Sequence, residues 1–239
     1  MPEGQVLEFT HVTKRFNEVT AVSDFSARVE PGAVTAFLGP NGAGKTTTLR
    51  ILLGLARPDS GTALVAGVRF RDLRSPARTI GALLDLAGAH PAMTARAHLR
   101  TYGALGGLPH KRVDQTLAAV GADEYADRRV GTFSTGMRQR LGLATALLGE
   151  PEILVLDEPL NGLDPAGIAW LRSFLRRFAD DGGTVLLSSH VLNELEHTVD
   201  DVVVLDRGRV RWSGTLAETT ADGRSLETAF LQLTEEVAA

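Results

Sequence analysis

The chain has 239 residues, enough for one large domain or for a domain with a sizeable insertion. Its formal net charge of −4 argues against a dedicated nucleic-acid-binding protein, and the absence of cysteine excludes disulfides and thiolate metal sites. The N-terminal segment MPEGQVLEF lacks the apolar core of a signal peptide, and no apolar run is long enough to span a membrane. If the protein works at a membrane, we therefore expect another chain to supply the spanning helices.

Two short strands are predicted first, at residues 5–12 and 20–30, where apolar and polar residues alternate loosely. A turn is expected between them at Arg15–Glu18. Such alternation is typical of strands with one face buried and the other exposed.

A glycine-rich loop follows a strand predicted at 34–38. Its sequence, GPNGAGKT at 39–46, matches the pattern G-x-x-x-x-G-K-[ST], and a helix is expected from Thr46 onward. The glycines let the backbone turn sharply and direct N–H groups toward phosphate oxygens. Lys45 adds a positive charge at the same oxygens, and the Thr46 hydroxyl suits Mg²⁺. An ordinary turn with an incidental lysine would not explain why loop, spacing and flanking elements agree.

The remaining predicted elements alternate between strands and helices, which indicates a mainly parallel α/β sheet. The strands are expected at 61–70, 152–158, 183–190 and 201–206, and the second of them is buried. The helices are expected with breaks across 86–149, at 164–183, at 191–199 and at 225–237. The helix at 164–183 is amphipathic and is capped by Asp164.

Two of these strands end in the same letters, VLD, at Asp157 and Asp206. The first is followed by Glu-Pro at 158–159 and the second by Arg-Gly at 207–208. A phosphate loop needs a second Mg²⁺ anchor on a neighbouring strand. Adjacent side chains in an extended segment point in different directions, so Asp157 can bind the Mg²⁺ shell while Glu158 polarises a water. Asp206 has no second carboxylate and is interpreted as a strand-end turn residue.

Together the motifs resemble those of the ATP-binding subunits of ABC transporters, along nearly the full chain. The matching segments are the phosphate loop at 39–46, FSTGM at 133–137 like the signature, ILVLDEP at 153–159, NGLD at 161–164 like the D-loop, and SSH at 188–190 like the switch histidine. The resemblance implies an α/β fold: a P-loop NTPase core with a mainly parallel sheet, a small antiparallel β-layer and an inserted α-helical subdomain. It implies one ATPase domain, made of a core at 1–85 and 150–214, a helical subdomain at 86–149 and a C-terminal helical tail at 215–239.

The resemblance also assigns roles to single residues. It implies catalysis by Glu158, His190 and Lys45, and Mg²⁺ binding by Thr46 and Asp157. The residues implied to bind ATP are Phe16, which would stack on adenine, and Gly39, Pro40, Asn41, Gly42, Ala43, Gly44, Lys45, Thr46 and Thr47. Two alternatives stay open: Phe16 as a core residue under the β-layer, and His190 as a structural residue. The other histidines, at positions 11, 90, 98, 110 and 197, lack a comparable setting and are expected at the surface.

The signature segment begins a helix expected at 136–149, whose N-terminus offers amides and a hydroxyl to an anion. The resemblance implies that Ser134, Thr135 and Gly136 contact the γ-phosphate bound by another subunit, with two chains facing head to tail. Simple N-capping by Ser134 would satisfy the helix equally well. Asp164 likewise keeps two compatible interpretations, a helix N-cap and a D-loop contact across the dimer.

The chain departs from the family pattern at two places. Asp85, within IGALLDLAGAHPAMT at 80–94, stands where the family usually has glutamine. An ionised aspartate is shorter and accepts hydrogen bonds only; it could ligate Mg²⁺ or be a turn residue. In the signature, Phe133, Thr135 and Met137 stand where the family prefers Leu, Gly and Gln.

The function implied by the resemblance is that of a subunit which binds and hydrolyses ATP, dimerises around it and powers a membrane exporter, of antibiotics, drugs or peptides. The implied cofactors are ATP and Mg²⁺. The expected partners are a second ATPase subunit, identical or different, and a separate transmembrane permease, without nucleic acid. The expected location is the cytoplasmic face of the cell membrane, held there by the permease. Two alternatives remain, a soluble ABC-type ATPase in an assembly or nucleic-acid process and an ATP sensor with little turnover.

Overall fold

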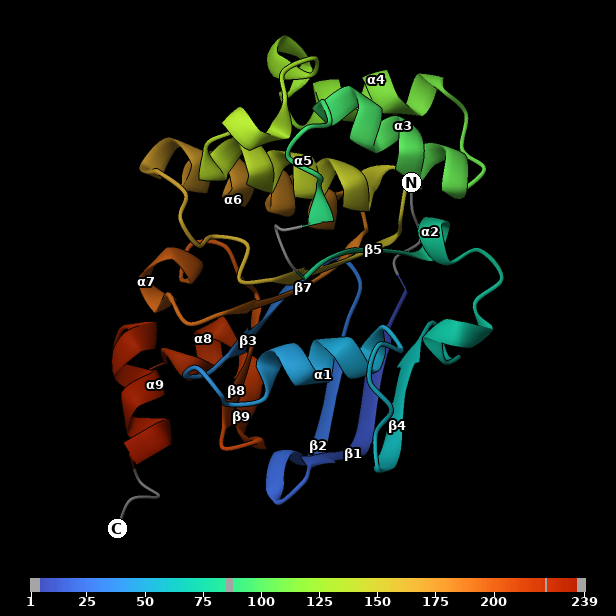
Figure 1. The fold of residues 1–239 in the computed structure, drawn as a ribbon. Coiled ribbons are helices and arrows are strands. Elements are labelled where there is room, and N and C mark those ends of the chain that lie inside the picture. Colours follow the sequence, from blue (N-terminus) through green and yellow to red (C-terminus); the bar gives the residue numbers. More distant parts are fainter. Residues whose placement is uncertain (1–4, 85–87, 222, 236–239) are drawn as a thin grey trace.

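The structure, a computed structural model, describes residues 5–84, 88–221 and 223–235, which form two β-sheets with helices around them (Figure 1). The strands are β1 (Leu7–Phe16), β2 (Val19–Val29), β3 (Val34–Leu38), β4 (Ser60–Val65), β5 (Ile80–Leu83), β6 (Ile153–Asp157), β7 (Thr184–Ser189), β8 (Asp201–Asp206) and β9 (Arg209–Thr215). The helices are α1 (Lys45–Leu52), α2 (Pro76–Thr79), α3 (Ala95–Leu105), α4 (Lys111–Ala119), α5 (Thr135–Leu147), α6 (Pro165–Asp180), α7 (Leu192–Leu195), α8 (Leu216–Thr219) and α9 (Leu226–Glu235).

The larger sheet has the strand order β5-β6-β7-β3-β8-β9. Its first five strands are parallel, and β9 pairs with β8 in the antiparallel direction. The mainly parallel sheet expected from the alternating elements is therefore confirmed. Because the carboxyl ends of parallel strands lie at one edge of a sheet, the segments that follow β3, β6 and β7 meet there.

The smaller sheet is antiparallel, in the order β2-β1-β4, and confirms the expected β-layer. Three phenylalanines hold it against the large sheet. The ring centroids of Phe9 and Phe25 lie 5.2 Å apart, and both rings contact Phe37 of β3 at 5.7 and 5.4 Å. Edge-on and tilted contacts of this kind are favoured by the ring quadrupoles.

The central strands are buried on both faces, and their alternating side chains enter two separate apolar cores. In β6, Leu154 and Leu156 belong to the core that includes α3, α4, α5 and α6. Ile153 and Val155 belong to the other core, with α1 and the small sheet. Figure 1 shows this layering, with α3, α4 and α5 above the large sheet and α1, β1, β2 and β4 below it.

The helical layer is held together by apolar contacts of α5. Leu141 and Ala144 of α5 and Leu148, the residue that follows it, are buried, and Met137 packs partly against the same core. Within the part of the chain that the structure describes, the helices are too short or too polar for one of them to cross a lipid bilayer.

Two predicted elements differ from the structure, and one further strand was not predicted. The strand predicted at 61–70 ends at Val65, because Ala66 (φ 52°) and Gly67 (φ 77°) turn the chain. The helix predicted at 191–199 is limited to α7, of four residues. Strand β9 was not predicted; it returns from the tight turn that follows Asp206 and pairs with β8.

Candidate active site

The phosphate loop, residues 39–46, requires glycine at specific positions. A Cβ atom on Gly39 would lie 2.4 Å from the carbonyl oxygen of Leu205, and one on Gly44 would lie 2.4 Å from that of Ala21. Gly44 also has a φ of 105° and Gly42 a φ of 84°, values that other residues rarely adopt. The loop then leads into α1, which begins at Lys45, so backbone N–H groups of the helix N-terminus face the loop.

Lys45 is held inside this loop. Its side chain is only 5% exposed. The ammonium nitrogen donates to the carbonyl oxygens of Gly39 and Pro40, at 2.5 and 3.3 Å, and lies 3.3 Å from Oε1 of Glu158. The structure thus brings Lys45, from the start of α1, beside the carboxylate that follows β6.

Asp157, the last residue of β6, accepts two side-chain hydrogen bonds. Thr46 Oγ1 donates to its Oδ2 at 2.7 Å, and Ser188 Oγ donates to its Oδ1. Ser188 faces Asp157 because β6 and β7 pair in that register. Sequence reasoning predicted that Thr46 and Asp157 meet but missed Ser188, although it lies two residues before His190 in the SSH segment.

Glu158 lies among Lys45, Ser188 and His190. Its backbone N–H donates to the carbonyl oxygen and the Oγ of Ser188, at 3.2 and 3.0 Å. Its Oε2 lies 2.9 Å from Nδ1 of His190 and accepts from the His190 backbone N–H at 3.3 Å. Its φ of 49° falls in the left-handed region, which is uncommon outside glycine and clusters at functional sites.

The oxygen atoms around Thr46 fit a magnesium ion that is shared with phosphates. Thr46 and Asp157 offer a hydroxyl and a carboxylate within 2.7 Å of each other. The described residues contain no group of three or more His, Cys, Asp or Glu that could hold a metal ion. Mg²⁺ usually takes one or two protein oxygens and completes its shell with substrate phosphates and water, so two are enough. Asp85, the third predicted ligand, lies outside the described residues.

The signature and D-loop segments pack against each other within the chain. Ser134 caps α5, since its Oγ accepts from the Met137 N–H at 3.3 Å, and Asp164 caps α6 by accepting from Gly167 at 2.8 Å. Both N-cap predictions are confirmed. A Cβ on Gly162 would lie 2.9 Å from Cγ2 of Thr135. Figure 1 shows α5 above the large sheet and α1 below it, so the signature and phosphate loop of one chain do not meet.

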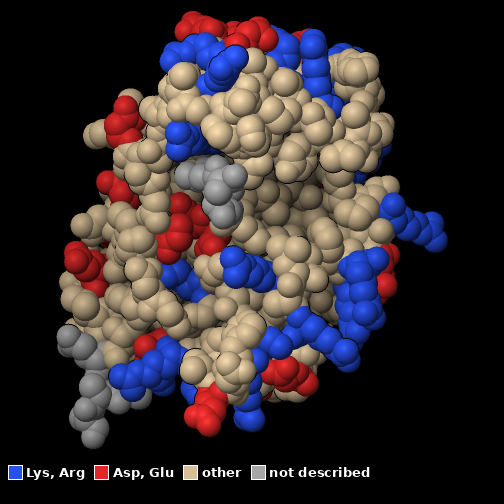
Figure 2. Space-filling model, viewed as in Figure 1, with Lys and Arg blue, Asp and Glu red and all other residues tan. Residues whose placement is uncertain are grey.

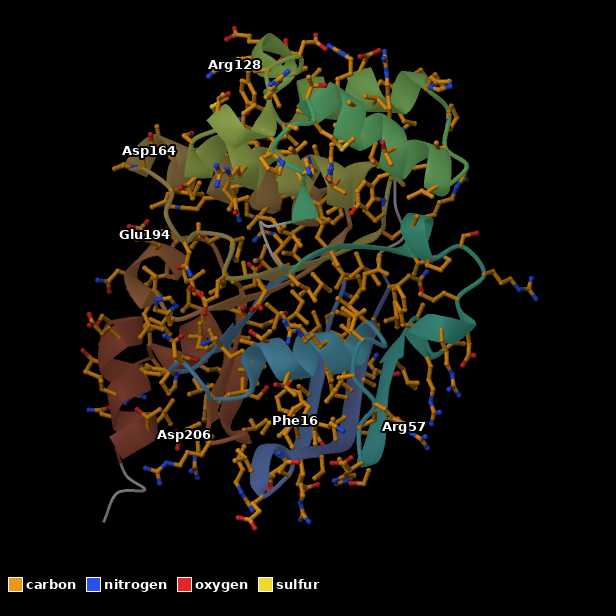
Figure 3. The ribbon with its side chains drawn as sticks, viewed as in Figure 1. Phe16, Arg57, Arg128, Asp164, Glu194 and Asp206 are labelled. Carbon is orange, nitrogen blue, oxygen red and sulfur yellow. The ribbon has the colours of Figure 1, made fainter. Side chains whose placement is uncertain are left out.

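Phe16 ends β1 and lies at the surface. Its side chain is 51% exposed, which excludes the alternative that it is a core residue. The ammonium of Lys14 lies 5.2 Å from its ring centroid, a distance at which a cation and an aromatic face attract. Figure 3 shows Phe16 at the end of the β1–β2 hairpin, well separated from Asp164 near α6.

The prediction that His98 lies at the surface is wrong. Its side chain is 5% exposed, its Nε2 lies 3.1 Å from Thr145 Oγ1, and its ring packs 4.7 Å from that of Tyr102. Burial lowers the pKa of His98. Positions 95, 98 and 99 are all buried on α3, so the helical spacing of the apolar face could have identified it.

His98 lines a cavity of about 190 Å³ between β5, α3 and α5, together with Leu83, Arg138 and Leu141. The surface in Figure 2 is hollowed between the helical layer and α1. The cavity that His98 lines is bounded below by β5 and above by α3 and α5, and none of its lining residues belongs to the phosphate loop.

Asp206, the other VLD aspartate, has a different environment. It ends β8, is 9% exposed, and its Oδ2 accepts from Arg211 Nη2 at 3.0 Å. In the turn that follows, Gly208 (φ 78°) donates from its N–H to the carbonyl of Ala43 at 3.0 Å and accepts from the Ser23 N–H at 2.8 Å. The prediction of a strand-end residue is confirmed, and the turn after it supports the phosphate loop, which was not predicted.

Comparisons with known proteins show which proteins this chain resembles in sequence and in fold. The profile of the ABC transporter family matches residues 22–161. The bacitracin transport ATP-binding protein BcrA of Bacillus licheniformis is 39% identical over 86% of this chain and 68% of its own length. The lantibiotic transport ATP-binding protein SrtF of Streptococcus pyogenes is 34% identical over 86% of this chain and 89% of its own. A solved ATP-binding subunit of an ABC transporter superposes with a TM-score of 0.85 at 28% identity, covering 95% of this chain and 99% of that one.

Proposed function

Since the chain belongs to the ABC transporter family and is one of its ATP-hydrolysing subunits, we propose that it powers a membrane exporter whose spanning helices lie on another chain. The observation that carries the proposal is the group of Lys45, Thr46, Asp157, Glu158 and His190, drawn from α1, β6 and the end of β7 to one edge of the sheet. Such a group joins a phosphate loop to a carboxylate that can activate water.

The phosphate loop would bind ATP. Its backbone N–H groups and the N-terminus of α1 would surround the β- and γ-phosphates, and Lys45 would add a positive charge. The loop residues from Gly39 to Thr47 are assigned to this contact. Phe16, exposed at the end of β1, would stack its ring on the adenine.

Thr46 and Asp157 would hold Mg²⁺. When bound, Mg²⁺ would supply positive charge that stabilises the charge developing on the phosphate oxygens. Ser188 supports this arrangement, since its hydroxyl donates to Oδ1 of Asp157 and leaves Oδ2 directed at Thr46.

Glu158 would act as the general base. Its Oε1 faces Lys45 and its Oε2 faces His190, so the carboxylate has a defined orientation at the end of β6. It would accept a proton from the water that attacks the γ-phosphate, while His190 would orient the carboxylate and contact the γ-phosphate. Lys45 would stabilise the charge that develops on the γ-phosphate oxygens.

A second ATPase subunit would complete each site. Ser134, Thr135 and Gly136 begin α5 in the upper layer, and they would contact the γ-phosphate bound by the partner. Asp164 would add a D-loop contact across the same interface. The chain would be divided as in other members of the family, into a core at 1–85 and 150–214, a helical subdomain at 86–149 and a C-terminal tail at 215–239.

The relatives favour transport over the two alternatives, a soluble ATPase of an assembly or nucleic-acid process and an ATP sensor with little turnover. BcrA and SrtF are named for bacitracin and lantibiotic transport. We propose cargo of the same class, peptide antibiotics or other drugs. The chain would lie at the cytoplasmic face of the membrane, held by a permease that carries the cargo path.

Two measurements test the proposal. The purified chain should hydrolyse ATP in a steady-state assay that requires Mg²⁺, and it should copurify with a multi-spanning membrane protein when expressed with its neighbouring genes. Absence of turnover with the membrane partner present would favour a sensor. Turnover without any membrane partner, but with a soluble assembly factor or nucleic acid retained, would favour the soluble alternative.

A further inference from the structure

One polar side chain of α5 is buried at the segment that follows the proposed general base. Gln139 is 3% exposed, and its Nε2 donates to the carbonyl oxygen of Pro159 at 2.6 Å. A buried amide of this kind is stable only when it is hydrogen-bonded, so both groups depend on the contact. No role of the phosphate loop, signature or D-loop accounts for it.

Pro159 directly follows Glu158, and its carbonyl is the only backbone hydrogen-bonding group that a proline has. Glu158 itself is left-handed, with a φ of 49°, and a residue before proline is restricted in its conformation. Its N–H is held on the other side by Ser188 of β7. The backbone around Glu158 is therefore fixed from two directions, by the large sheet through Ser188 and by α5 through Gln139.

The same helix carries the signature at its N-terminus. Gln139 lies five residues beyond Ser134, about 7.5 Å along an α-helix. Thr135 lies close to Gly162, in the same loop as Pro159, since a Cβ atom on Gly162 would be only 2.9 Å from Cγ2 of Thr135. Because a helix moves as a unit over such a length, a shift of the signature end would carry Gln139 with it.

We propose that Gln139 is a positioning residue, which holds the Glu158 carboxylate in its working orientation only while α5 is seated against the loop after β6. The inference rests on the proposed ATPase function and adds a link within one chain: the helix that contacts the partner's nucleotide also sets the base beside its own. Closure of the dimer would then affect hydrolysis at both nucleotides.

The first test replaces Gln139 by methionine, which has a similar length and cannot donate to Pro159. Since a misplacement of about 1 Å can cost roughly 10²-fold in rate, we expect kcat to fall about 10- to 100-fold. The KM for ATP and the affinity for nucleotide should stay within about twofold, because the hydrogen bond of Gln139 is made to Pro159 and not to the phosphate loop. Gln115→Met, at an exposed glutamine of α4, is the matched control and should leave both unchanged.

A second variant keeps the test decisive if the methionine variant does not fold. Gln139→Asn retains a polar amide but is one methylene shorter, so it should lose the bond and show the same fall in kcat. In a Glu158→Gln background, where hydrolysis is blocked, Gln139→Asn should still form the ATP-dependent dimer, which a general loss of structure would abolish.

The outcomes separate this inference from the proposed function. If the wild-type chain hydrolyses ATP and both Gln139→Asn and Gln139→Met keep kcat within twofold of it, the proposed role of Gln139 is overturned. The proposed function would then stand. Equal losses in kcat, nucleotide affinity and dimer formation would also overturn it, because they indicate a structural role. Absence of ATP hydrolysis by the wild-type chain, alone and with its membrane partner, would overturn the proposed function and this inference with it.

Discussion

Strands β6 and β8 both end in Val-Leu-Asp at the same edge of the large sheet, yet their aspartates have different partners. Asp157 accepts hydrogen bonds from Thr46 and Ser188, while Asp206 is paired with Arg211 of the next strand. The neighbouring strand decides the difference. β6 lies beside β7, which supplies Ser188, whereas β8 turns back into β9, which supplies an arginine. The environment of a strand-end aspartate is therefore set less by its own identity than by the side chains that the neighbouring strand supplies.

The carboxyl ends of β6 and β8 also contact the phosphate loop in different ways. The β6 end contacts it through side chains, at Lys45 and Thr46. The β8 end contacts it through the backbone, where the Gly208 N–H donates to Ala43. We infer that the first end serves the chemistry of ATP hydrolysis and the second the shape of the loop.

The largest expected effect comes from Glu158→Gln, at the β6 end. Removing a general base typically lowers a rate by about 10²–10⁴-fold. Glutamine keeps the size of the side chain, so ATP binding should persist and closed dimers should accumulate. Steady-state ATPase activity and size-exclusion chromatography with ATP would measure the two effects. Glu124→Gln, at an exposed position of the helical layer, is the control; normal turnover in Glu158→Gln would contradict the assignment of the base.

A smaller loss is expected from Asp157→Asn. The amide is neutral and would weaken the contact with Mg²⁺, at a cost of roughly 10- to 100-fold in metal affinity or activity. The concentration of Mg²⁺ needed for half-maximal turnover should rise, which a titration of the ATPase rate would detect. An unchanged Mg²⁺ requirement would indicate that Asp157 has a structural role only.

Gly208→Val tests the supporting role of the β8 end. A Cβ atom there would lie 2.8 Å from the carbonyl oxygen of Ala21, and the φ of 78° disfavours a branched residue. We expect a destabilisation of about 1–3 kcal/mol, with a fall in Tm of several °C and a rise in the KM for ATP. Gly67→Val is the control, at a similar φ of 77° with no heavy atom within 4 Å of a Cβ. If the two variants had the same KM, the link from the turn to the phosphate loop would be refuted.

The smallest effect is expected from Asp206→Asn, the counterpart of Asp157→Asn. Asparagine can still accept from Arg211, so the loss should be about 1 kcal/mol or less. Turnover and Mg²⁺ dependence should remain within twofold of the wild type. A large loss of activity would mean that the second VLD aspartate takes part in the chemistry.

Much of the fold and the phosphate loop could be predicted because their signals are local. The loop needs glycines at fixed positions for its own backbone angles, and the caps Ser134 and Asp164 satisfy amides three residues away. Hydrophobic strands separated by helices indicate a parallel sheet without knowledge of its order. The error at His98 concerns a local signal that was overlooked, since His98 lies on the buried face of α3; only its partner, Thr145 of α5, depends on the tertiary packing.

What the sequence determined by itself is the set of chemical groups: a phosphate loop with Lys45 and Thr46, a carboxylate pair at Asp157 and Glu158, and a histidine at 190. These follow from short motifs, in which each residue is read with its immediate neighbours. The tertiary structure alone decided which residues support these groups. Ser188 lies opposite Asp157 through strand register, Gln139 lies against Pro159 through helix packing, and Gly208 lies beside the phosphate loop. Those contacts join positions 20 to 165 residues apart, and no local pattern encodes them because they exist only once the sheet and the helical layer have assembled.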